Sequence, residues 1–126
     1  MHTKTLMLAL ALSGALAGGV AAHHSFAVYF DPEADVTVEG TVKAFRFTNP
    51  HGTLVLDVDG TEWRGETNAP VVLQRRGWTR GSVRAGDLVT VSGWRARDGR
   101  NYMRIREVRD AQGRMIGNAP FGQNDG

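Results

Sequence analysis

Residues 68–78 read Asn-Ala-Pro-Val-Val-Leu-Gln-Arg-Arg-Gly-Trp, and they interrupt a chain that otherwise alternates between apolar and polar residues. Asn68 can cap a helix, Pro70 is tolerated in a first helical turn, and Gly77 stops a helix. We expect the final tryptophan of the stretch to pack beneath that helix. The stretch therefore predicts one short helix, over residues 71–76, inside a chain of strands.

Five segments with the alternation typical of half-buried β-strands surround this helix, three before it and two after it. They cover residues 36–47, 53–58, 61–66, 88–95 and 102–109. Asp59-Gly60 and Asp98-Gly99 are turn signals inside two hairpins. In the first strand Gly40 fits a bend or bulge, and the alternation changes phase near Ala44.

Three strands, a short helix and two further strands form the element order of the OB-fold, a small five-stranded barrel. We therefore expect an all-β barrel domain over residues 36–112, with an N-terminal arm over 23–35 and a flexible tail over 113–126. An open β-sandwich fragment is the alternative, which the single helical break disfavours. The predicted interior holds Val38, Val42, Leu54, Leu56, Val58, Trp63, Leu88, either Val89 or Val91, Met103, Ile105 and Val108.

Residues 1–22 have the features of a secretory signal peptide. Lys4 precedes an almost wholly apolar run over residues 6–16, and small residues lead to Ala22. The run is shorter than the roughly 20 residues that cross a bilayer, which favours cleavage over a retained membrane helix. The chain has no cysteine, so we expect neither a lipid anchor nor disulfides, and packing alone should stabilise the exported product.

Cleavage after Ala22 would make His23 the first residue, whose α-amine and imidazole can bind one metal ion together. His24 follows, and His51 comes directly after Pro50 in a predicted turn. A nitrogen-rich site without thiolates suits Cu(II), in preference to zinc. We therefore expect His23, His24 and His51 to bind copper if the arm folds back onto the barrel end that carries this turn.

Several alternatives to this site remain open. Asp31 and Glu33 are candidates for additional oxygen ligands, and Met103 is a more distant candidate for a soft ligand. Cleavage after Ala21 would place His24 third in the chain, a position that binds Cu(II) through backbone amides without His51. A metal-free interpretation treats the paired histidines as an exposed tail and His51 as an ordinary turn residue.

The net charge of +2 conceals an asymmetry along the chain. Residues 23–66 contain eight acids and three bases, whereas residues 75–114 contain eleven arginines and four acids. A bipolar surface can steer an anionic partner. The second candidate function is therefore a metal-free adaptor that contacts an anionic ligand or an envelope protein through Arg95, Arg97 and Arg104. The other interpretation is that the arginines alternate along solvent-facing strands.

Other function classes find little support. Arginines and aromatic residues on an OB barrel are typical of single-stranded nucleic-acid binding, but export out of the cytoplasm argues against it. The serines lack a nucleophile-elbow context, and no Gly-rich stretch has the lysine of a phosphate loop. We therefore expect a binding protein rather than an enzyme.

Several motifs together resemble a known family. They are His23-His24-Ser25-Phe26, Gly40-Thr41-Val42, Asn49-Pro50-His51, Gly77-Trp78-Thr79-Arg80 and Gly86-Asp87-Leu88-Val89-Thr90-Val91-Ser92-Gly93. Over residues 23–114 the chain resembles the small exported bacterial proteins grouped as domain of unknown function 6152. The resemblance implies an exported, periplasmic domain and brings no activity with it. Gly52 stands where such chains often have Trp or Ser after Asn-Pro-His, so we expect no side-chain function there.

Overall fold

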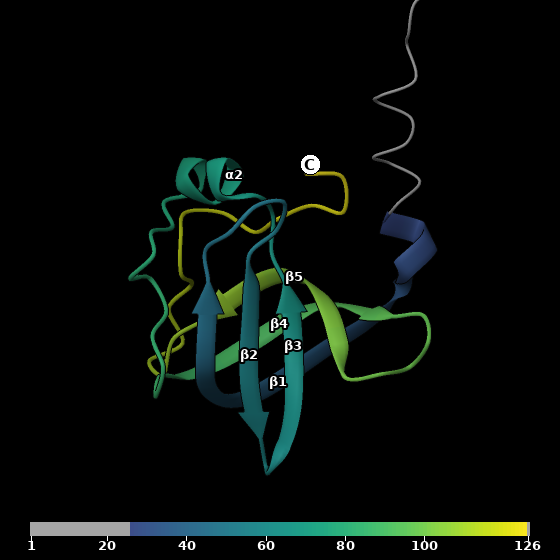
Figure 1. The fold of residues 1–126 in the computed structure, drawn as a ribbon, viewed down its shortest axis with the longest axis horizontal. Coiled ribbons are helices and arrows are strands. Elements are labelled where there is room, and N and C mark those ends of the chain that lie inside the picture. Colours follow the sequence, from purple (N-terminus) through teal and green to yellow (C-terminus); the bar gives the residue numbers. More distant parts are fainter. Residues whose placement is uncertain (1–25, 126) are drawn as a thin grey trace, which may run out of the picture.

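The computed structural model describes residues 26–125, which form the coloured ribbon of Figure 1. The elements are β1 (Phe30–Arg46), β2 (Thr53–Val58), β3 (Thr61–Glu66), α2 (Pro70–Arg75), β4 (Leu88–Ala96) and β5 (Tyr102–Arg109). Residues 26–29 add a helical turn directly before β1. This order confirms the predicted three strands, short helix and two strands. The predicted signal peptide, His23 and His24 lie outside the described residues.

The strands follow one another in the order β1-β2-β3-β5-β4, and β1 also pairs with β4, so the sheet is a closed barrel. All neighbours are antiparallel except β3 and β5, which are parallel over the three pairs from Arg64↔Tyr102 to Glu66↔Arg104. Helix α2, the loop between β1 and β2 and the last part of the described chain meet at the same end of the barrel (Figure 1). Within residues 26–125 no helix is both long enough and apolar enough to span a membrane.

Two bulges set which residues face the interior. The register between β1 and β2 shifts between Val42 and Ala44, where the sequence predicts a change of phase. The register between β4 and β5 shifts beside Gly93, because β5 contains one extra residue there. This second bulge lets Ile105 and Val108 both enter the core although they are three positions apart.

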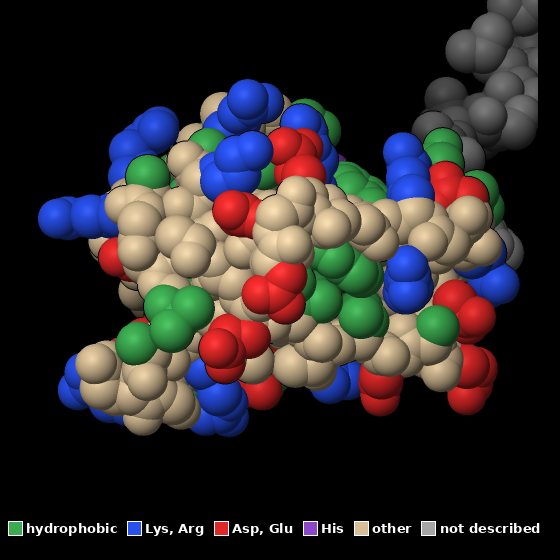
Figure 2. Space-filling model, turned by 90° about the horizontal axis from the view of Figure 1, so that it is seen from below, with side chains coloured by type: hydrophobic (Ala, Val, Ile, Leu, Met, Phe, Trp, Pro, Cys, Tyr) green, Lys and Arg blue, Asp and Glu red, His purple; other side chains and the backbone are tan. Residues whose placement is uncertain are grey.

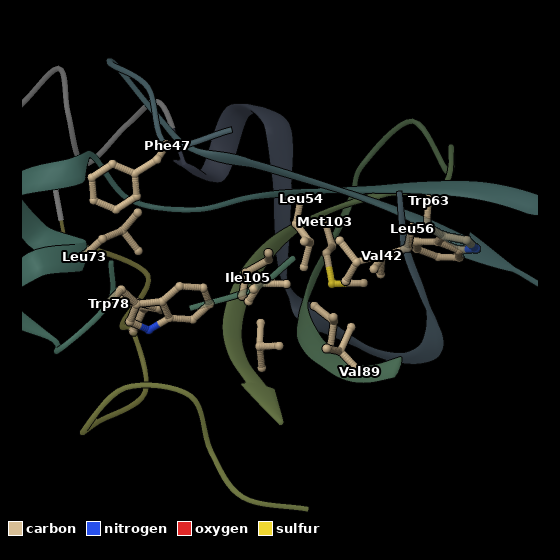
Figure 3. Packing of buried hydrophobic residues seen from close by; sticks show 14 residues of the cluster. Val42, Phe47, Leu54, Leu56, Trp63, Leu73, Trp78, Val89, Met103 and Ile105 are labelled. Atoms are coloured by element: carbon tan, nitrogen blue, oxygen red, sulfur yellow. The ribbon is translucent and has the colours of Figure 1, made fainter. Parts of the chain in front are cut away.

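The main core extends from the barrel interior to α2, and Figure 3 shows Phe47, Leu73 and Trp78 together at the helix end of it. Most of the predicted interior is confirmed, and Trp78 is buried as expected. The prediction for Leu88 is wrong, since its side chain is 46% exposed. Val89 and Val91 share the inward face of β4, and strand alternation therefore turns Leu88 outward. The full buried set is Val42, Phe47, Leu54, Leu56, Trp63, Leu73, Trp78, Val83, Val89, Val91, Met103, Ile105, Val108 and Phe121.

Asn68 is not the cap of α2. The N-cap residue is Ala69, and no side chain caps the helix. Asn68 is instead fully buried, and its side-chain amide donates to the backbone carbonyl of Asp125. Pro70 occupies the start of the helix as predicted.

Both ends of the domain pack against the barrel, which the sequence did not predict. Strand β1 begins at Phe30, so residues 30–35, expected in the arm, belong to a strand that pairs with β4. Residues 116–125, called here the C-terminal segment and expected to be flexible, pack along the barrel. Phe121 is buried in the core, and its backbone N–H donates to the carbonyl of Arg106 over 2.8 Å.

Candidate functional site

His51 lies in the loop between β1 and β2, beside the ends of β3 and β5. Its Nε2 is 3.5 Å from Oε1 of Glu66, and its Nδ1 is 3.4 Å from Nη1 of Arg104. A guanidinium only donates hydrogen bonds, so Nδ1 is the acceptor and Nε2 is the nitrogen that faces Glu66. About 40% of the His51 side chain is exposed. We call His51, Glu66, Tyr102 and Arg104 the His51 cluster.

Glu66 connects the members of this cluster. Its Oε1 accepts a 2.8 Å hydrogen bond from Arg104, and its Oε2 accepts a 2.7 Å bond from the hydroxyl of Tyr102. Because Glu66 is opposite Arg104 in the parallel pairing of β3 with β5, the backbone itself fixes the ion pair. Each carboxylate oxygen has two lone pairs, so each keeps one for a further partner.

Arg104 carries a buried positive charge, and its guanidinium group has acceptors among its neighbours. Besides Glu66, it donates from Nη2 to the carbonyl of Asp125 over 3.2 Å. Its Nε and the amide oxygen of Asn68 have no hydrogen-bond partner among the described residues. Removing one member of a buried ion pair is strongly destabilising, so Arg104 belongs to the scaffold of the cluster. This corrects the expectation that Arg104 lies on an exposed contact surface.

Gly52 lets the His51 loop close on the barrel end. Its backbone N–H donates to Asn68, and its carbonyl accepts a 2.9 Å bond from Thr67. A Cβ at position 52 would collide with the hydroxyl of Thr67. The Asn49–Pro50 peptide bond before His51 is cis. Glycine at this position therefore allows the close approach that places His51 beside the end of β3.

A second aromatic cluster links the start of the described chain to the His51 cluster. It contains Phe26, Phe30, Trp94 and Ala96, with Tyr102 packed against it. Phe26 meets Trp94 edge-on with 5.5 Å between ring centroids, and Phe30 stacks on Tyr102 at 5.6 Å. The same tyrosine donates to Glu66. Phe26, the first described residue, thus belongs to a cluster that adjoins the His51 cluster through Tyr102.

Comparison with known proteins places the chain in a family. A family model described as "Family of unknown function (DUF6152)" matches residues 11–104. The chain belongs to this family. No curated protein matches it.

One solved structure similar to the DUF6152 chain is the crystal structure of a ZRD-deleted mutant of TiaS in complex with agmatine. The two chains are 14% identical, and the TM-score is 0.47. The similarity covers 72% of the DUF6152 chain and 23% of the TiaS chain. The DUF6152 chain therefore spans less than a quarter of that protein's length.

The predicted metal ligands of the DUF6152 protein divide into four groups. His51 is accessible, whereas His23 and His24 lie outside the described residues. Met103 is buried in the barrel core, which rules out its predicted role as a soft ligand (Figure 3). Between residues 26 and 125 no three His, Asp or Glu side chains are grouped closely enough to hold a metal ion, so neither Asp31 nor Glu33 completes a site at His51.

The arginine-rich half does not form a continuous basic face. Arg106 pairs with Asp35 from the acidic half, and Arg76 pairs with Asp125. Other guanidinium groups lie over aromatic rings, as Arg95 does over Trp63. Acidic and basic side chains intermingle on the face shown in Figure 2. The surface of this face is therefore mixed in charge rather than bipolar.

The phenol of Tyr102 gives the stability of the DUF6152 protein a dependence on alkaline pH. Burial, and then the hydrogen bond to the Glu66 carboxylate, raise the pKa of Tyr102 far above its usual value. The folded protein therefore keeps this proton where the unfolded chain, with a tyrosine pKa of about 10, releases it. The contribution of this proton to the free energy of unfolding is fully present below about pH 10 and is lost as the pH rises further.

The free energy of unfolding of the wild type should fall between about pH 8 and about pH 11. We expect it to fall less over this range in Tyr102→Phe, which has no phenol proton at this position. Urea denaturation at several pH values measures this loss. Tyr29, which is 62% exposed, provides the matched control, and Tyr29→Phe should keep the wild-type dependence. The explanation fails if Tyr102→Phe loses as much stability over this range as the wild type.

Proposed function

We propose that the DUF6152 protein is an exported, periplasmic binding protein that holds copper between its processed N-terminus and His51. The proposed scaffold is an OB-fold, supported by the strand order β1-β2-β3-β5-β4 and by α2 between β3 and β4. The signal-like residues 1–22 support export, and cleavage after Ala22 would produce the required terminus.

The observation that carries the proposal is the path from the first described residues to His51. Phe26 and Phe30 pack in the aromatic cluster that includes Tyr102, and Tyr102 binds the carboxylate beside His51. His23 precedes Phe26 by three residues, and three extended residues span about 10 Å. We infer that an N-terminal histidine on this short tether reaches His51, whose side chain is 40% exposed.

The chemistry of the donors favours copper. The α-amine and imidazole of His23 would form one chelate ring, and His51 would add a third nitrogen. Cu(II) lies at the top of the affinity order for nitrogen and oxygen ligands, above zinc. His24 is the alternative donor from the same end of the chain. Because Arg104 donates to Nδ1 of His51, the neutral ring carries its proton on Nε2, and a metal ion must displace this proton to bind there.

Calorimetric titration of protein processed in the periplasm with Cu(II) tests the proposal. His51→Ala should weaken binding about tenfold or more, because even residues behind the ligands of a metal site contribute 10–100-fold. N-terminal sequencing must first show that the sample begins at His23. Unchanged affinity in His51→Ala would eliminate the site. A sample that sequencing shows to begin at Ala22 should instead lose affinity in His24→Ala and keep it in His51→Ala.

A metal-free adaptor is the second candidate, and a polar hollow beside the barrel favours it. The hollow has a volume of about 530 Å³ and is lined by Glu62, Arg64, Arg100, Asn101 and Tyr102. Its two guanidinium groups suit an anionic ligand or an acidic segment of an envelope protein. Crosslinking in intact cells tests this candidate, which requires a partner that is captured by the wild type and lost in an Arg64→Glu, Arg100→Glu double variant.

A further inference from the structure

We infer that a second hollow, beside the end of α2, binds a small organic acid whose carboxylate is attached to an apolar ring. This hollow has a volume of about 360 Å³ and is lined by Phe47, Gln74, Trp78, Thr79, Arg80 and Gly81. Its volume lies within the range of small-molecule sites in proteins, about 300–1,000 Å³. None of its lining residues belongs to the proposed copper site or to the hollow around Tyr102.

Two aromatic rings supply the apolar part of the lining. Phe47 directly follows β1 and Trp78 comes shortly after α2, and both are buried core residues. They lie together with Leu73 at the helix end of the core (Figure 3). The backbone N–H of Trp78 donates to the carbonyl of Leu73 over 2.9 Å, which ties this residue to the helix. Because core packing fixes both rings, an apolar group can leave water for this hollow without rearranging the protein.

Arg80 supplies the positive charge of the hollow. Its guanidinium lies over the ring of Phe47, with 5.3 Å between Cζ and the ring centroid. Stacking uses the face of a guanidinium and leaves the N–H groups at its edge free to donate. Within the described chain this group has neither an ion pair nor a hydrogen bond, whereas Arg106, which also lies over an aromatic ring, donates to Asp35. The edge of Arg80 is therefore available for two parallel hydrogen bonds to a carboxylate.

The charges around the hollow also favour an anion. The guanidinium of Arg84 lies beside the loop that carries Arg80, and a Cβ at Gly81 would be only 3.3 Å from its Nη2. Arg84 has no ion pair in the part of the chain that the structure describes. Asp87 does not neutralise this guanidinium, since its carboxylate accepts instead from the backbone N–H of Arg84 over 2.9 Å. Gln74 adds a neutral amide with N–H donors, and none of the described residues that line the hollow is acidic.

Titration with benzoate, followed through the NMR chemical shifts of backbone and indole N–H groups, tests this site. In the wild type the largest shifts should come from Trp78, Thr79 and Gly81. Arg80→Gln keeps an N–H donor but removes the charge and should weaken benzoate binding about tenfold or more, because hydrogen bonds between charged groups are the strong ones. Arg106→Gln is the matched control, since it removes a guanidinium that lies over a ring outside the hollow, and it should keep the wild-type affinity.

Gln74→Glu is the second variant, and it places a carboxylate of nearly the same size at the hollow. Repulsion between like charges should weaken benzoate binding at least about tenfold and leave the binding of benzyl alcohol, which has the ring without the charge, unchanged. Equal benzoate affinities of the wild type and Arg80→Gln would overturn the assignment. Shifts confined to the surroundings of Tyr102 would also overturn it, because benzoate would then occupy the other hollow. Neither result depends on whether copper binds at His51.

Discussion

A single methionine added in front of His23 should lower the Cu(II) affinity of the protein at least about 100-fold. The added residue converts the α-amine of His23 into an amide, and the chelate ring of the terminal residue is lost. Joining two donors on one tether raises affinity by about 10²–10⁴-fold without any new contact. The effect should therefore exceed that of replacing His51, which contributes a single nitrogen.

Competition with a chelator of known affinity measures this difference between cytoplasmic protein beginning Met-His23 and processed protein beginning with His23. Mass spectrometry confirms each terminus before the titration. A methionine added after Gly126 is the control for chain length and should leave the affinity unchanged. Equal affinities of the two N-terminal forms would show that the terminal amine is not a ligand.

The largest loss of stability is expected for Gly93→Ala. Gly93 lies at the bulge between β4 and β5. A Cβ there would collide with the carbonyl oxygen of Arg104 and lie 3.1 Å from Cα of Ile105. Because both obstacles lie on the β5 backbone, no side-chain rotation can relieve the clash. We expect the free energy of unfolding to fall by about 3 kcal/mol or more, the upper range for overpacking.

Urea denaturation of Gly93→Ala and Gly122→Ala measures this effect against a matched substitution. A Cβ at Gly122 would lie 3.5 Å from the Asp125 carboxylate, which is ordinary contact, so this variant should stay within about 0.5 kcal/mol of the wild type. Equal free energies of unfolding for the two variants would contradict this prediction, because β4 and β5 would then accommodate the extra methyl group without losing stability.

The alternation of apolar residues was sufficient to predict the five strands, because most strands have one face toward a single core. Helix α2 was predicted from the interruption of this alternation, with Pro70 at its start and Gly77 after it. The same rule failed at both ends of the domain. The beginning of β1 contains Pro32 between acidic residues, which is typical of a loop, yet its pairing with β4 makes it a strand. The C-terminal segment has no periodicity and is held through Phe121, which is buried in the core, and Ile116, which packs against it.

Only part of the candidate site could be predicted from the sequence. Residue type and position pointed to His51, but nothing local linked it to Glu66 or Arg104. These two meet because β3 and β5 run parallel over three pairs, a contact between strands that are separated by α2 and β4. Arg104 also alternates with core residues as a solvent-facing arginine would. The Asn68 amide and the C-terminal segment cover it only in the folded chain.

The C-terminal segment also touches the beginning of the domain, since Gln123 donates to the carbonyl of Pro32. At the barrel end, the carbonyl of Asp125 accepts from the buried guanidinium of Arg104. Cutting the chain before Phe121 would therefore remove an acceptor from this guanidinium and leave a cavity in the core. The segment is thus a part of the cooperative folding unit.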